Sequence, residues 1–238
     1  MHTSGRTYFE AVRYIKSKET ETDLSYQINQ SLVSKPDYVQ YDEIQIKRLN
    51  QQALEAPRAM RYYNGRLITE ASVKKFDLGF SEKQDMVTIP VHSPDGIAVG
   101  FVGRSIEGKD FKNTPGLPKS KVLFNLHRVK TAGKVYVVES SFDAIRLDQC
   151  GFAAVATLGA NVSNIQTDLL QKYFNEIYVI ADNDEAGGNM KSKIVERLGN
   201  RVNVIQLNKQ YKDLGDMPDE EIKKLEETFD KTIAGMLQ

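Results

Sequence analysis

The sequence predicts an α/β protein in which a mixed α+β subdomain precedes a parallel sheet with helices on both faces. Two observations carry this prediction. From residue 131 onward, four short and almost wholly apolar runs alternate with stretches of helical periodicity, which is typical of buried parallel strands. Before residue 131, helical segments lead into two β-like runs that flank a turn.

The N-terminal region combines helical and polar segments. Residues 6–18 are predicted to form a helix because apolar side chains recur on one face, and the polar stretch 19–40 is interpreted as a linker. Asp42 is a candidate cap for a second helix over residues 43–60. Thr69 is a candidate cap for a third.

A β-hairpin is predicted next. Residues 86–91 and 97–102 are rich in apolar and β-branched side chains, and residues 93–96 between them have the turn sequence Ser-Pro-Asp-Gly. Glycine and proline residues then interrupt any regular period, so a loop follows. Together with the preceding helices, the hairpin and loop form a basic α+β subdomain over residues 41–130.

The second half alternates between strands and helices. The predicted strands are 135–138, 153–156, 177–180 and 202–205, and the predicted helices are 142–150, 166–173, 185–198 and 218–236. Apolar strands separated by helices favour one parallel sheet that is covered on both faces. We therefore expect four regions: 1–40 (N-terminal helix and linker), 41–130 (basic subdomain), 131–217 (sheet domain) and 218–238 (C-terminal helix).

The net charge of the chain conceals a split. The 238 residues hold 32 basic and 32 acidic side chains, so the formal net charge is zero. Residues 1–130 nevertheless carry 20 Lys and Arg against 15 Asp and Glu, whereas residues 131–238 carry 12 against 17. Such asymmetry indicates a surface that binds a polyanion, with a solvated charged face as the alternative.

The composition excludes several classes of protein and of site. No apolar run approaches the roughly 18 residues of a membrane span, and the first residues lack the apolar core of a secretory signal. A single cysteine, Cys150, excludes an internal disulfide and a multi-cysteine zinc site. Because the three histidines are scattered in the sequence, we expect any metal to be a hard cation held by carboxylates. We also expect a cytoplasmic protein.

Acidic side chains follow the predicted strands at their carboxyl ends. Glu139 comes directly after the first strand, and Asp182 and Asp184 come after the third. Asp213 and Asp216 follow the fourth strand after a loop. Clustered carboxylates repel and raise one another's pKa values, and a divalent cation relieves that conflict. Because Mg²⁺ typically uses one or two carboxylates together with phosphate oxygens, the pattern predicts phosphoryl or nucleotidyl transfer.

Each acid also has an ordinary structural interpretation. A lone Asp182 or Asp184 is typical of a helix cap, and Asp143 is typical of an acid in the first turn of a helix. Asp213 and Asp216 are compatible with simple loop acids. The coincidence of acids after three different strands favours the metal site over these alternatives.

The acidic pattern resembles the Toprim domain of topoisomerases, DnaG-type primases and related nucleases over about residues 133–217. The acids that carry the resemblance are Glu139, Asp182, Asp184 and Asp213. Ser140 departs from the pattern, because the family often has Gly after the first Glu. The spacing Asp213-Leu-Gly-Asp216 departs from the Asp-Pro-Asp of primases, so Asp213 is the expected ligand and the role of Asp216 stays open.

The upstream region resembles the basic subdomain of DnaG-type primases. The stretches that carry this resemblance, in the family's order, are 64–80, 89–104 and 113–124. Asp110 departs from the pattern, because it stands where the family has a lysine that precedes an aromatic residue. Either Lys109 or Lys112 is expected to replace that lysine. The combined resemblance covers about residues 60–217.

The resemblance implies roles for two groups of side chains. The expected ligands of Mg²⁺ or Mn²⁺ are Glu139, Asp182, Asp184 and Asp213. The residues expected at the nucleotide or the template are Arg66, Arg104, Lys112, Asn113, Lys119 and Lys121, and Lys119 is also expected to be catalytic together with the first three acids. The chemistry agrees, because a guanidinium group binds phosphate with two parallel hydrogen bonds and an ammonium group supplies a point charge.

The leading hypothesis is therefore the catalytic core of a DnaG-type DNA primase, which makes short RNA primers on single-stranded DNA from ribonucleoside triphosphates. The resemblance further implies a replicative helicase and a separate zinc-binding domain as partners, in the cytoplasm of a bacterium and with a phage as a candidate source. Two alternatives stay open. One is a Toprim nuclease that hydrolyses phosphodiesters, and the other is a non-catalytic subunit that binds single-stranded DNA or a replisome protein.

Overall fold

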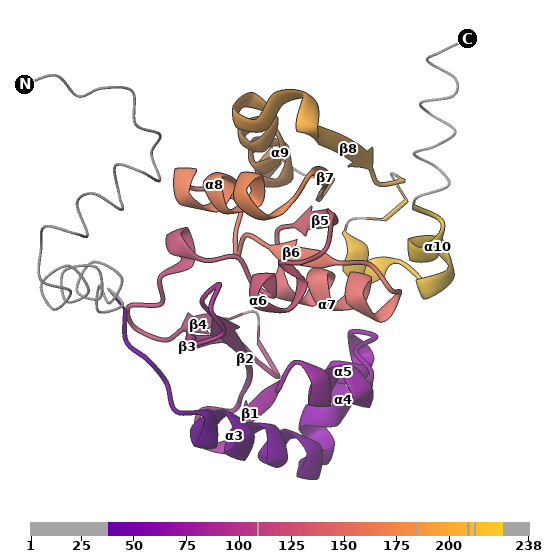
Figure 1. Ribbon diagram of the computed structural model, residues 1–238. Coiled ribbons are helices and arrows are strands. Elements are labelled where there is room, and N and C mark those ends of the chain that lie inside the picture. The colour runs from indigo at the N-terminus through magenta and orange to yellow at the C-terminus, as the bar shows by residue number, and fades with distance from the viewer. Residues whose placement is uncertain (1–37, 109, 184, 209, 212, 226–238) are drawn as a thin grey trace, which may run out of the picture. The chain divides into compact units, whose positions relative to one another are not determined.

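The computed structural model describes residues 38–108, 110–183, 185–208, 210–211 and 213–225. The helix predicted over residues 6–18 lies outside these residues, as does nearly all of the linker 19–40. The described residues from Val39 onward belong to one unit with two β-sheets (Figure 1). Among the helices that the structure describes, none has both the length and the apolar character needed to cross a membrane.

The first described helix is α3 (Glu43–Glu55), which begins after Asp42. The Asp42 carboxylate accepts a hydrogen bond from a backbone N–H in the first turn, so the predicted cap is confirmed. The single helix predicted over residues 43–60 is wrong, because the chain forms two helices there. The second is α4 (Pro57–Gly65), and its leading proline disfavours helical backbone at Ala56, where the first helix ends.

The first sheet contains four antiparallel strands in the order β1-β2-β3-β4. The strands are β1 (Gly79–Ser81), β2 (Met86–His92), β3 (Ala98–Ser105) and β4 (Phe111–Asn113). The predicted hairpin, formed by β2 and β3, is confirmed. The two outer strands are not predicted, because three residues are too few to show an alternating pattern. Helix α3 packs on this sheet through Ile46, which clusters with Ala98 and Phe101.

Short helices precede and follow the antiparallel sheet. Helix α5 (Glu70–Lys75) comes before β1 and begins after Thr69, whose hydroxyl accepts a hydrogen bond from a backbone N–H of the first turn, as predicted. Between β4 and the second sheet lie the 3-10 helix η2 (Lys119–Lys121) and α6 (Leu126–Val129). Phe76, at the end of α5, stacks on Phe124 with ring centroids 5.9 Å apart, so an apolar contact joins the two halves of this unit.

The second sheet contains four parallel strands in the order β6-β5-β7-β8. The strands are β5 (Lys134–Val138), β6 (Ala154–Ala156), β7 (Glu176–Ala181) and β8 (Val202–Gln206). The elements that connect or follow them are α7 (Ser141–Gln149), α8 (Asn164–Tyr173), α9 (Glu185–Leu198), η3 (Gly199–Arg201), η4 (Leu214–Asp216) and α10 (Asp219–Lys223). All four predicted strands are confirmed. The helix predicted over 218–236 is described only as α10, because residues 226–238 lie outside the described part.

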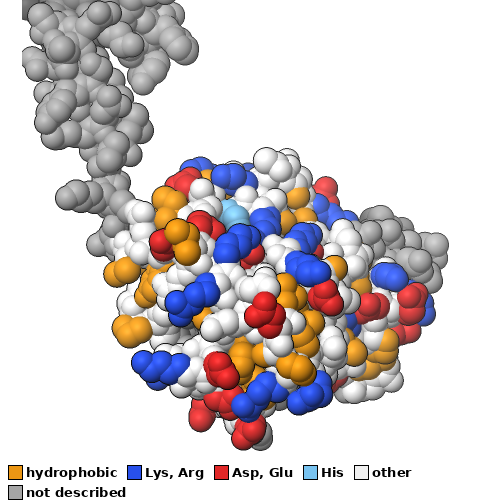
Figure 2. All heavy atoms as spheres, turned by 90° about the horizontal axis from the view of Figure 1, so that it is seen from below, with side chains coloured by type: hydrophobic (Ala, Val, Ile, Leu, Met, Phe, Trp, Pro, Cys, Tyr) orange, Lys and Arg blue, Asp and Glu red, His pale blue; other side chains and the backbone are white. Residues whose placement is uncertain are grey.

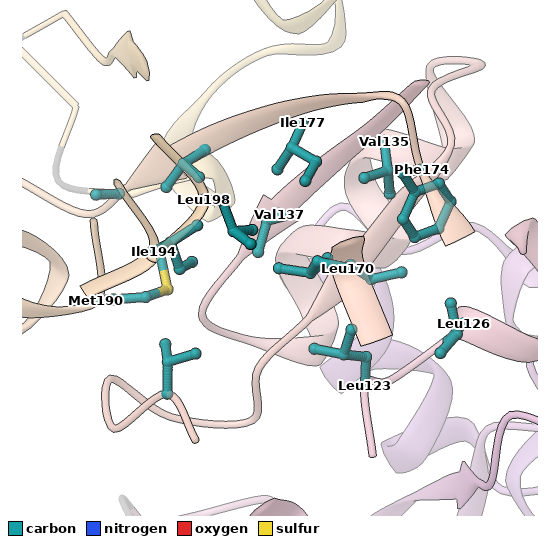
Figure 3. Close-up of a cluster of buried hydrophobic side chains, with 14 residues drawn as sticks. Leu123, Leu126, Val135, Val137, Leu170, Phe174, Ile177, Met190, Ile194 and Leu198 are labelled. Carbon is teal, nitrogen blue, oxygen red and sulfur yellow. The ribbon is translucent and has the colours of Figure 1, made fainter. Parts of the chain in front are cut away.

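Helices cover both faces of the parallel sheet, which confirms the predicted fold class. Leu170 of α8 and Ile194 of α9 pack on Val137 and Val179 of the central strands (Figure 3). Helix α7 lies on the opposite face (Figure 1). Because side chains of a strand point alternately to the two faces, the same strands supply apolar residues to both layers.

The surface of the first subdomain carries charges of both signs. Figure 2 shows Lys and Arg side chains interspersed with Asp and Glu on the side seen from below in Figure 1. Exposed ion pairs contribute to this balance, among them Lys74 with Glu70 and Arg58 with Asp85. Such pairs add little stability. The basic excess of the subdomain therefore does not form one positive field on this side.

Candidate active site

The strand order creates a topological switch point between β5 and β7. From β5 the chain proceeds through α7 to β6 on one side, and from β6 it returns through α8 to β7 on the other. Ligands of open α/β sheets bind outside the carboxyl ends of the strands at such a point. Glu139 follows β5 directly and Asp182 follows β7 directly. Two predicted acids therefore end neighbouring strands where a site is expected.

The backbone of α9 passes close to Asp182. A Cβ atom added at Gly187 would lie 2.5 Å from the carbonyl oxygen and 2.7 Å from the amide nitrogen of Asp182. No side chain fits in that space, so glycine is required for the first turn of α9 to pack on the strand end. The structure thus keeps the backbone that carries Asp182 pressed against a helix.

Asp213 reaches the same place from the loop after β8. It precedes the short helix η4, which ends at Asp216. A Cβ atom at Gly215 would lie 2.9 Å from Asp213 Oδ1 and 3.9 Å from Asp143 Oδ1. Glycine at this position therefore leaves room for the carboxylate of the loop beside the carboxylate of α7.

Asp143 is buried in the first turn of α7. The Ser140 hydroxyl caps the helix: it accepts the Asp143 backbone N–H at 3.3 Å and donates to Asp143 Oδ2 at 2.7 Å. Burial, together with the negative charges of Asp213 and Glu139, raises the pKa of Asp143 to about 6. The Ser140 hydrogen bond and the positive charge of Arg104 oppose this rise.

These acids line one wall of an open cleft of about 610 Å³. Its acidic lining residues are Glu139, Asp143, Asp182, Asp213 and Asp216, and its basic lining residues are Arg61, Arg66, Arg104 and Arg146. The acids come from the parallel sheet domain, whereas three of the arginines come from α4, its C-terminal end and β3. The cleft therefore lies between the two sheets, with charges of opposite sign on its two walls.

Aromatic rings support the two predicted arginines of the cleft. The Arg104 guanidinium lies 4.2 Å from the centre of the Phe111 ring, and the Arg66 guanidinium lies 5.2 Å from that of Tyr62. Within the described residues, neither guanidinium forms an ion pair with a carboxylate. Burial and the neighbouring charge of Arg66 lower the pKa of Arg104 from its ordinary value. Two adjacent and unneutralised guanidinium groups form a site that favours an anion such as phosphate.

A smaller cavity adjoins the cleft and brings in two more predicted residues. Asn113 and Lys119 line it together with Arg104 and Glu139, which are also part of the main cleft. Lys112 lies elsewhere: it lines a separate groove between α3 and β4. Because neighbouring residues of a strand point to opposite faces, Lys112 and Phe111 cannot both face the cleft.

Two predicted residues lie apart from these cavities or outside the described chain. Lys121 ends the short helix η2 and lines neither the main cleft nor its smaller neighbour. Asp184 lies outside the described residues.

The donor set of the cleft fits a hard divalent cation. Carboxylate oxygens are suitable ligands for Mg²⁺ or Mn²⁺. A cation would also offset the negative charges of Asp213 and Glu139, which add to the effect of burial in raising the pKa of Asp143. In the part of the chain that the structure describes, no three acidic, His or Cys side chains are gathered closely enough to hold an ion alone. That arrangement suits an ion held by one or two carboxylates and by phosphate oxygens of a substrate.

Several residues of the cleft are missed by the sequence-based prediction. Asp143 is interpreted there only as an ordinary acid of a first helical turn, although Ser140-x-x-Asp143 directly after Glu139 is a capping pattern that places it beside the strand end. Arg61, Tyr62 and the other aromatic supports have no signal of their own in the sequence. They are recognised only when α4 and β4 are placed against the sheet ends.

Comparisons with known proteins agree with this architecture. A family model described as Toprim-like matches residues 136–217. A DNA primase of Mycoplasma genitalium is 32% identical over 143 residues, which cover 55% of this chain and 24% of the primase. The chain thus spans about a quarter of the length of that relative.

Solved primase structures share the fold. A DnaG primase catalytic domain bound to single-stranded DNA aligns with a TM-score of 0.65 and 19% identity, covering 79% of this chain and 78% of that one. The zinc binding and RNA polymerase domains of the Aquifex aeolicus primase align with a TM-score of 0.66 and 24% identity, covering 77% and 59%. Residues 136–217 of this chain thus match a Toprim-like family model, and the chain has the fold of the catalytic core of DnaG-type primases.

Proposed function

We propose that this chain is the catalytic core of a DnaG-type DNA primase, which joins ribonucleotides into a short primer on single-stranded DNA. One observation carries the proposal: acids from three strand ends, Glu139, Asp182 and Asp213, face Arg66 and Arg104 across one cleft. An acidic wall opposite a basic wall suits a reaction in which metal-bound phosphates lie between them. The primase relatives and the fold shared with DnaG domains support this choice.

The acidic wall is the proposed site for Mg²⁺ or Mn²⁺. The ligands would be Glu139, Asp182, Asp184 and Asp213. A cation held by these residues would neutralise charge on the triphosphate and favour ionisation of the attacking 3′-hydroxyl. Asp143 contributes a further buried negative charge, and the hydrogen bond from Ser140 holds its carboxylate in place. Glycine at position 215 keeps the Asp213 loop close enough for the two carboxylates to act on the same region.

The basic wall is the proposed site for the nucleotide phosphates. The Arg104 guanidinium lies over the Phe111 ring, and the Arg66 guanidinium lies near the Tyr62 ring and donates from Nε to the Tyr62 hydroxyl at 3.0 Å. Guanidinium groups bind phosphate through two parallel hydrogen bonds. In the proposed reaction, the primer 3′-hydroxyl loses its proton to solvent as its oxygen forms a bond to the α-phosphorus, and the bond from that phosphorus to the oxygen bridging the α- and β-phosphates breaks. Pyrophosphate leaves with the charge that the arginines stabilise. Lys119 and Asn113, in the adjoining cavity, are proposed to orient the incoming nucleotide.

The template is proposed to follow the basic subdomain outside the cleft. Lys112 lines a groove with Arg48 and Lys83, and these three positive side chains suit a phosphate backbone. Lys121 is proposed as a further contact to the template. The DnaG domain that was solved with single-stranded DNA supports such a substrate.

The partners and the domain limits are also part of the proposal. We propose a division at residues 41–130, 131–217 and 218–238, after an N-terminal segment 1–40. A replicative helicase and a zinc-binding domain would complete the activity in the cytoplasm of a bacterium, for a protein encoded by the cell or by a phage. The Aquifex aeolicus primase, which was solved with its zinc binding domain, supports the second partner.

The proposal is tested by incubating the protein with single-stranded DNA, labelled ribonucleoside triphosphates and Mg²⁺ or Mn²⁺. We expect short RNA products that depend on both template and metal and are lost in Asp182→Asn and Glu139→Gln. Lys172→Gln, an exposed change on α8, is the matched control and should retain full synthesis. The assay is repeated with a zinc-binding domain of a bacterial primase added in trans.

Two other results would assign the chain to a different class. Metal-dependent cleavage of labelled DNA or RNA without nucleotide incorporation would identify a nuclease. Binding of single-stranded DNA that is unaffected by Asp182→Asn, with neither synthesis nor cleavage, would identify a non-catalytic subunit.

A further inference from the structure

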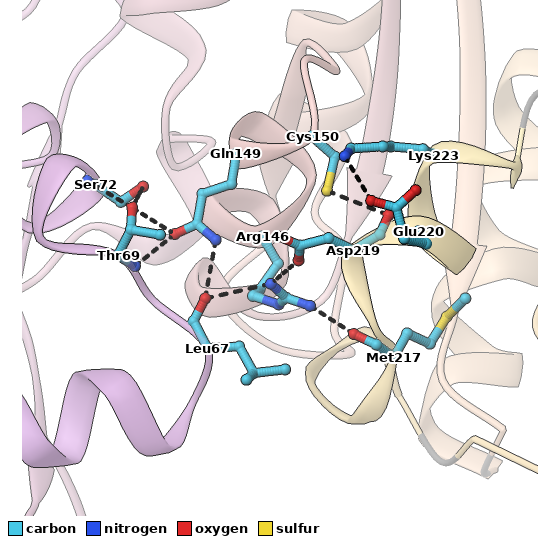
Figure 4. Close-up of polar contacts among 10 residues, drawn as sticks. All are labelled: Leu67, Thr69, Ser72, Arg146, Gln149, Cys150, Met217, Asp219, Glu220 and Lys223. Atoms are coloured by element: carbon cyan, nitrogen blue, oxygen red, sulfur yellow. Dashed lines mark hydrogen bonds and ion pairs between the residues drawn. The ribbon is translucent and has the colours of Figure 1, made fainter.

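Arg146 is a buried arginine that connects three separate segments of the chain. It lies on α7, and its side chain is only 1% exposed. One terminal nitrogen donates to the Leu67 carbonyl at 3.2 Å and to the Asp219 carboxylate, and the other donates to the Met217 carbonyl at 2.5 Å (Figure 4). The planar fork of the guanidinium group therefore fixes two backbone carbonyls and one carboxylate relative to α7.

Gln149, one turn further along α7, strengthens the same junction. Its amide nitrogen donates to the Leu67 carbonyl at 2.9 Å, and its amide oxygen accepts from the Thr69 backbone N–H at 2.9 Å (Figure 4). Leu67 has a φ of 57°, a left-handed conformation that is unfavourable for a leucine. Two hydrogen bonds to its carbonyl from one helix hold that strained turn in place.

Each anchored segment carries a residue of the cleft. Leu67 directly follows Arg66 of the basic wall, and Met217 ends the turn that begins at Asp213 of the acidic wall. Arg146 itself lines the cleft and lies one turn after Asp143 on α7. A single side chain thus links the basic wall, the acidic loop and the helix that carries the buried acid.

Stability alone is a poor reason for this arrangement. Burying a guanidinium group carries a large desolvation penalty, and apolar replacements of buried ion pairs are often neutral or stabilising. The Arg146 Nε is buried without a hydrogen-bond partner among the described residues, so part of the penalty is not offset. An apolar side chain could fill the same space, but it could not form the hydrogen bonds that fix the three segments relative to one another.

We propose that Arg146 is a positioning residue that fixes the spacing between Arg66 and Asp213 across the cleft. The inference deepens the proposed primase function, since the two walls would act on one nucleotide. Loss of the fork removes the hydrogen bond that ties Met217 to α7 and leaves the turn at Leu67 bonded to that helix through Gln149. Misplacement of reacting groups by about 1 Å is enough to cost about 100-fold in rate.

The relative position of the two anchored segments is followed with nitroxide labels and pulsed electron resonance, on the helices that come after them, α5 and α10. The parent protein carries Cys150→Ser, so that Ala71→Cys on α5 and Glu220→Cys on α10 are the labelled sites, both of them exposed. We expect a narrow distance distribution in this parent. Arg146→Met should shift or broaden it, and Arg146→Lys should give an intermediate result, because a point charge replaces the fork. A distribution in Arg146→Met that superimposes on that of the parent would overturn the proposal.

A matched control and a second variant keep the test decisive. Asp148, also on α7, forms an ion pair with Lys75 at 2.6 Å and so bridges the same two halves nearer the surface. Asp148→Asn should leave the distance distribution unchanged. If Arg146→Met does not fold, Asp219→Ala removes the carboxylate from the junction and should broaden the distribution. A distribution in Asp219→Ala as narrow as in the parent would then overturn the proposal.

Primer synthesis supplies the functional half of the test. Arg146→Met should lower kcat about 100-fold, Arg146→Lys should restore part of it, and Asp148→Asn should stay within about twofold of the parent. Normal kcat in Arg146→Met would contradict the positioning role. If the parent itself makes no RNA, the proposed function fails, whereas the label distances still decide whether Arg146 holds the two walls.

Discussion

The Arg104 guanidinium lies 4.2 Å from the centre of the Phe111 ring, whose side chain is largely exposed at the mouth of the cleft. The ring orients a guanidinium group that no carboxylate of the described residues holds. Phe111→Ala should therefore raise the KM for ribonucleoside triphosphates about two- to fivefold, which corresponds to the 0.5–1 kcal/mol of an exposed cation–π contact. Steady-state primer synthesis at varied nucleotide concentration measures this change.

The control for this contact keeps the aromatic face. Phe111→Tyr retains a ring under Arg104 and should leave the KM unchanged. Arg104→Gln removes the charge itself and should raise the KM more than Phe111→Ala does. Equal KM values in Phe111→Ala and in the parent would show that the ring does not orient the arginine.

The Asp143 carboxylate should support primer synthesis but lower the free energy of unfolding. Its carboxylate is 5% exposed, and burial is the main reason that its pKa rises to about 6. Asp143→Asn removes the buried charge and keeps an oxygen that accepts from Ser140. We expect the free energy of unfolding at pH 7 to increase by about 2 kcal/mol without divalent cations, while primer synthesis falls. Urea denaturation and the primer assay measure the two effects.

The matched control for Asp143→Asn is Asp148→Asn on the same helix. That side chain pairs with Lys75, so its replacement should leave stability unchanged or slightly lower it. A loss of stability in Asp143→Asn would mean that the carboxylate is better satisfied in the fold than its burial indicates.

The sheet domain could be predicted from the sequence because its signals are local. Each parallel strand is a short apolar run between helical segments, and the acids Glu139 and Asp182 directly follow two of those runs. The outer strands β1 and β4 could not be predicted, because pairing with β2 and β3 gives these three-residue stretches their strand conformation. The end of the first helix at Ala56 is indicated in the sequence by Pro57, which disfavours helical backbone in the residue before it. The prediction of one long helix did not take this proline into account.

The cleft could be predicted only in part, for the same physical reason. The acids that follow strands can be recognised in the sequence by that position. Asp143 is recognised only in the structure, where its carboxylate lies near that of Asp213 beside Gly215. The link from Arg146 to Met217 joins residues 71 positions apart, and no local pattern indicates it. Lys112 is the opposite case, because the sequence predicts it at the site but its side chain lines a different groove.

The basic side chains proposed to contact the template should make binding of single-stranded DNA strongly dependent on salt. Each phosphate neutralised by a basic side chain contributes about −0.7 to the slope of log K against log salt for a single strand. Lys112→Gln should therefore make this slope less steep by about 0.7, and Lys121→Gln should have a similar effect. Fluorescence anisotropy with labelled oligonucleotides at several salt concentrations gives the slopes. Lys172→Gln is the control, and a Lys112→Gln slope equal to that of the control would exclude a phosphate contact at Lys112.

Two histidines, the buried His92 and the half-buried His127, should make the fold sensitive to acid. The rings of His92 and His127 lie with centroids 4.5 Å apart, although the two residues are far apart in the sequence. Burial, with the nearby charge of Arg128 as the next cause, lowers the pKa of His92 to about 4 and that of His127 to about 3. Both are therefore neutral in the folded protein at pH 7. The unfolded chain, with ordinary pKa values near 6.5, takes up protons first as the pH falls.

The free energy of unfolding should accordingly decrease between about pH 6.5 and pH 4, by about 3 kcal/mol for His92 alone. His127→Phe keeps a flat ring against His92 but removes one titrating group, so it should make the decrease shallower. Glu43→Gln is the control for the carboxylate that lies 4.0 Å from His92 Nε2 and should leave most of the decrease in place. Urea unfolding at pH 7, 6 and 5 measures the slope. A slope in His127→Phe as steep as in the parent would mean that His127 does not contribute to the acid sensitivity.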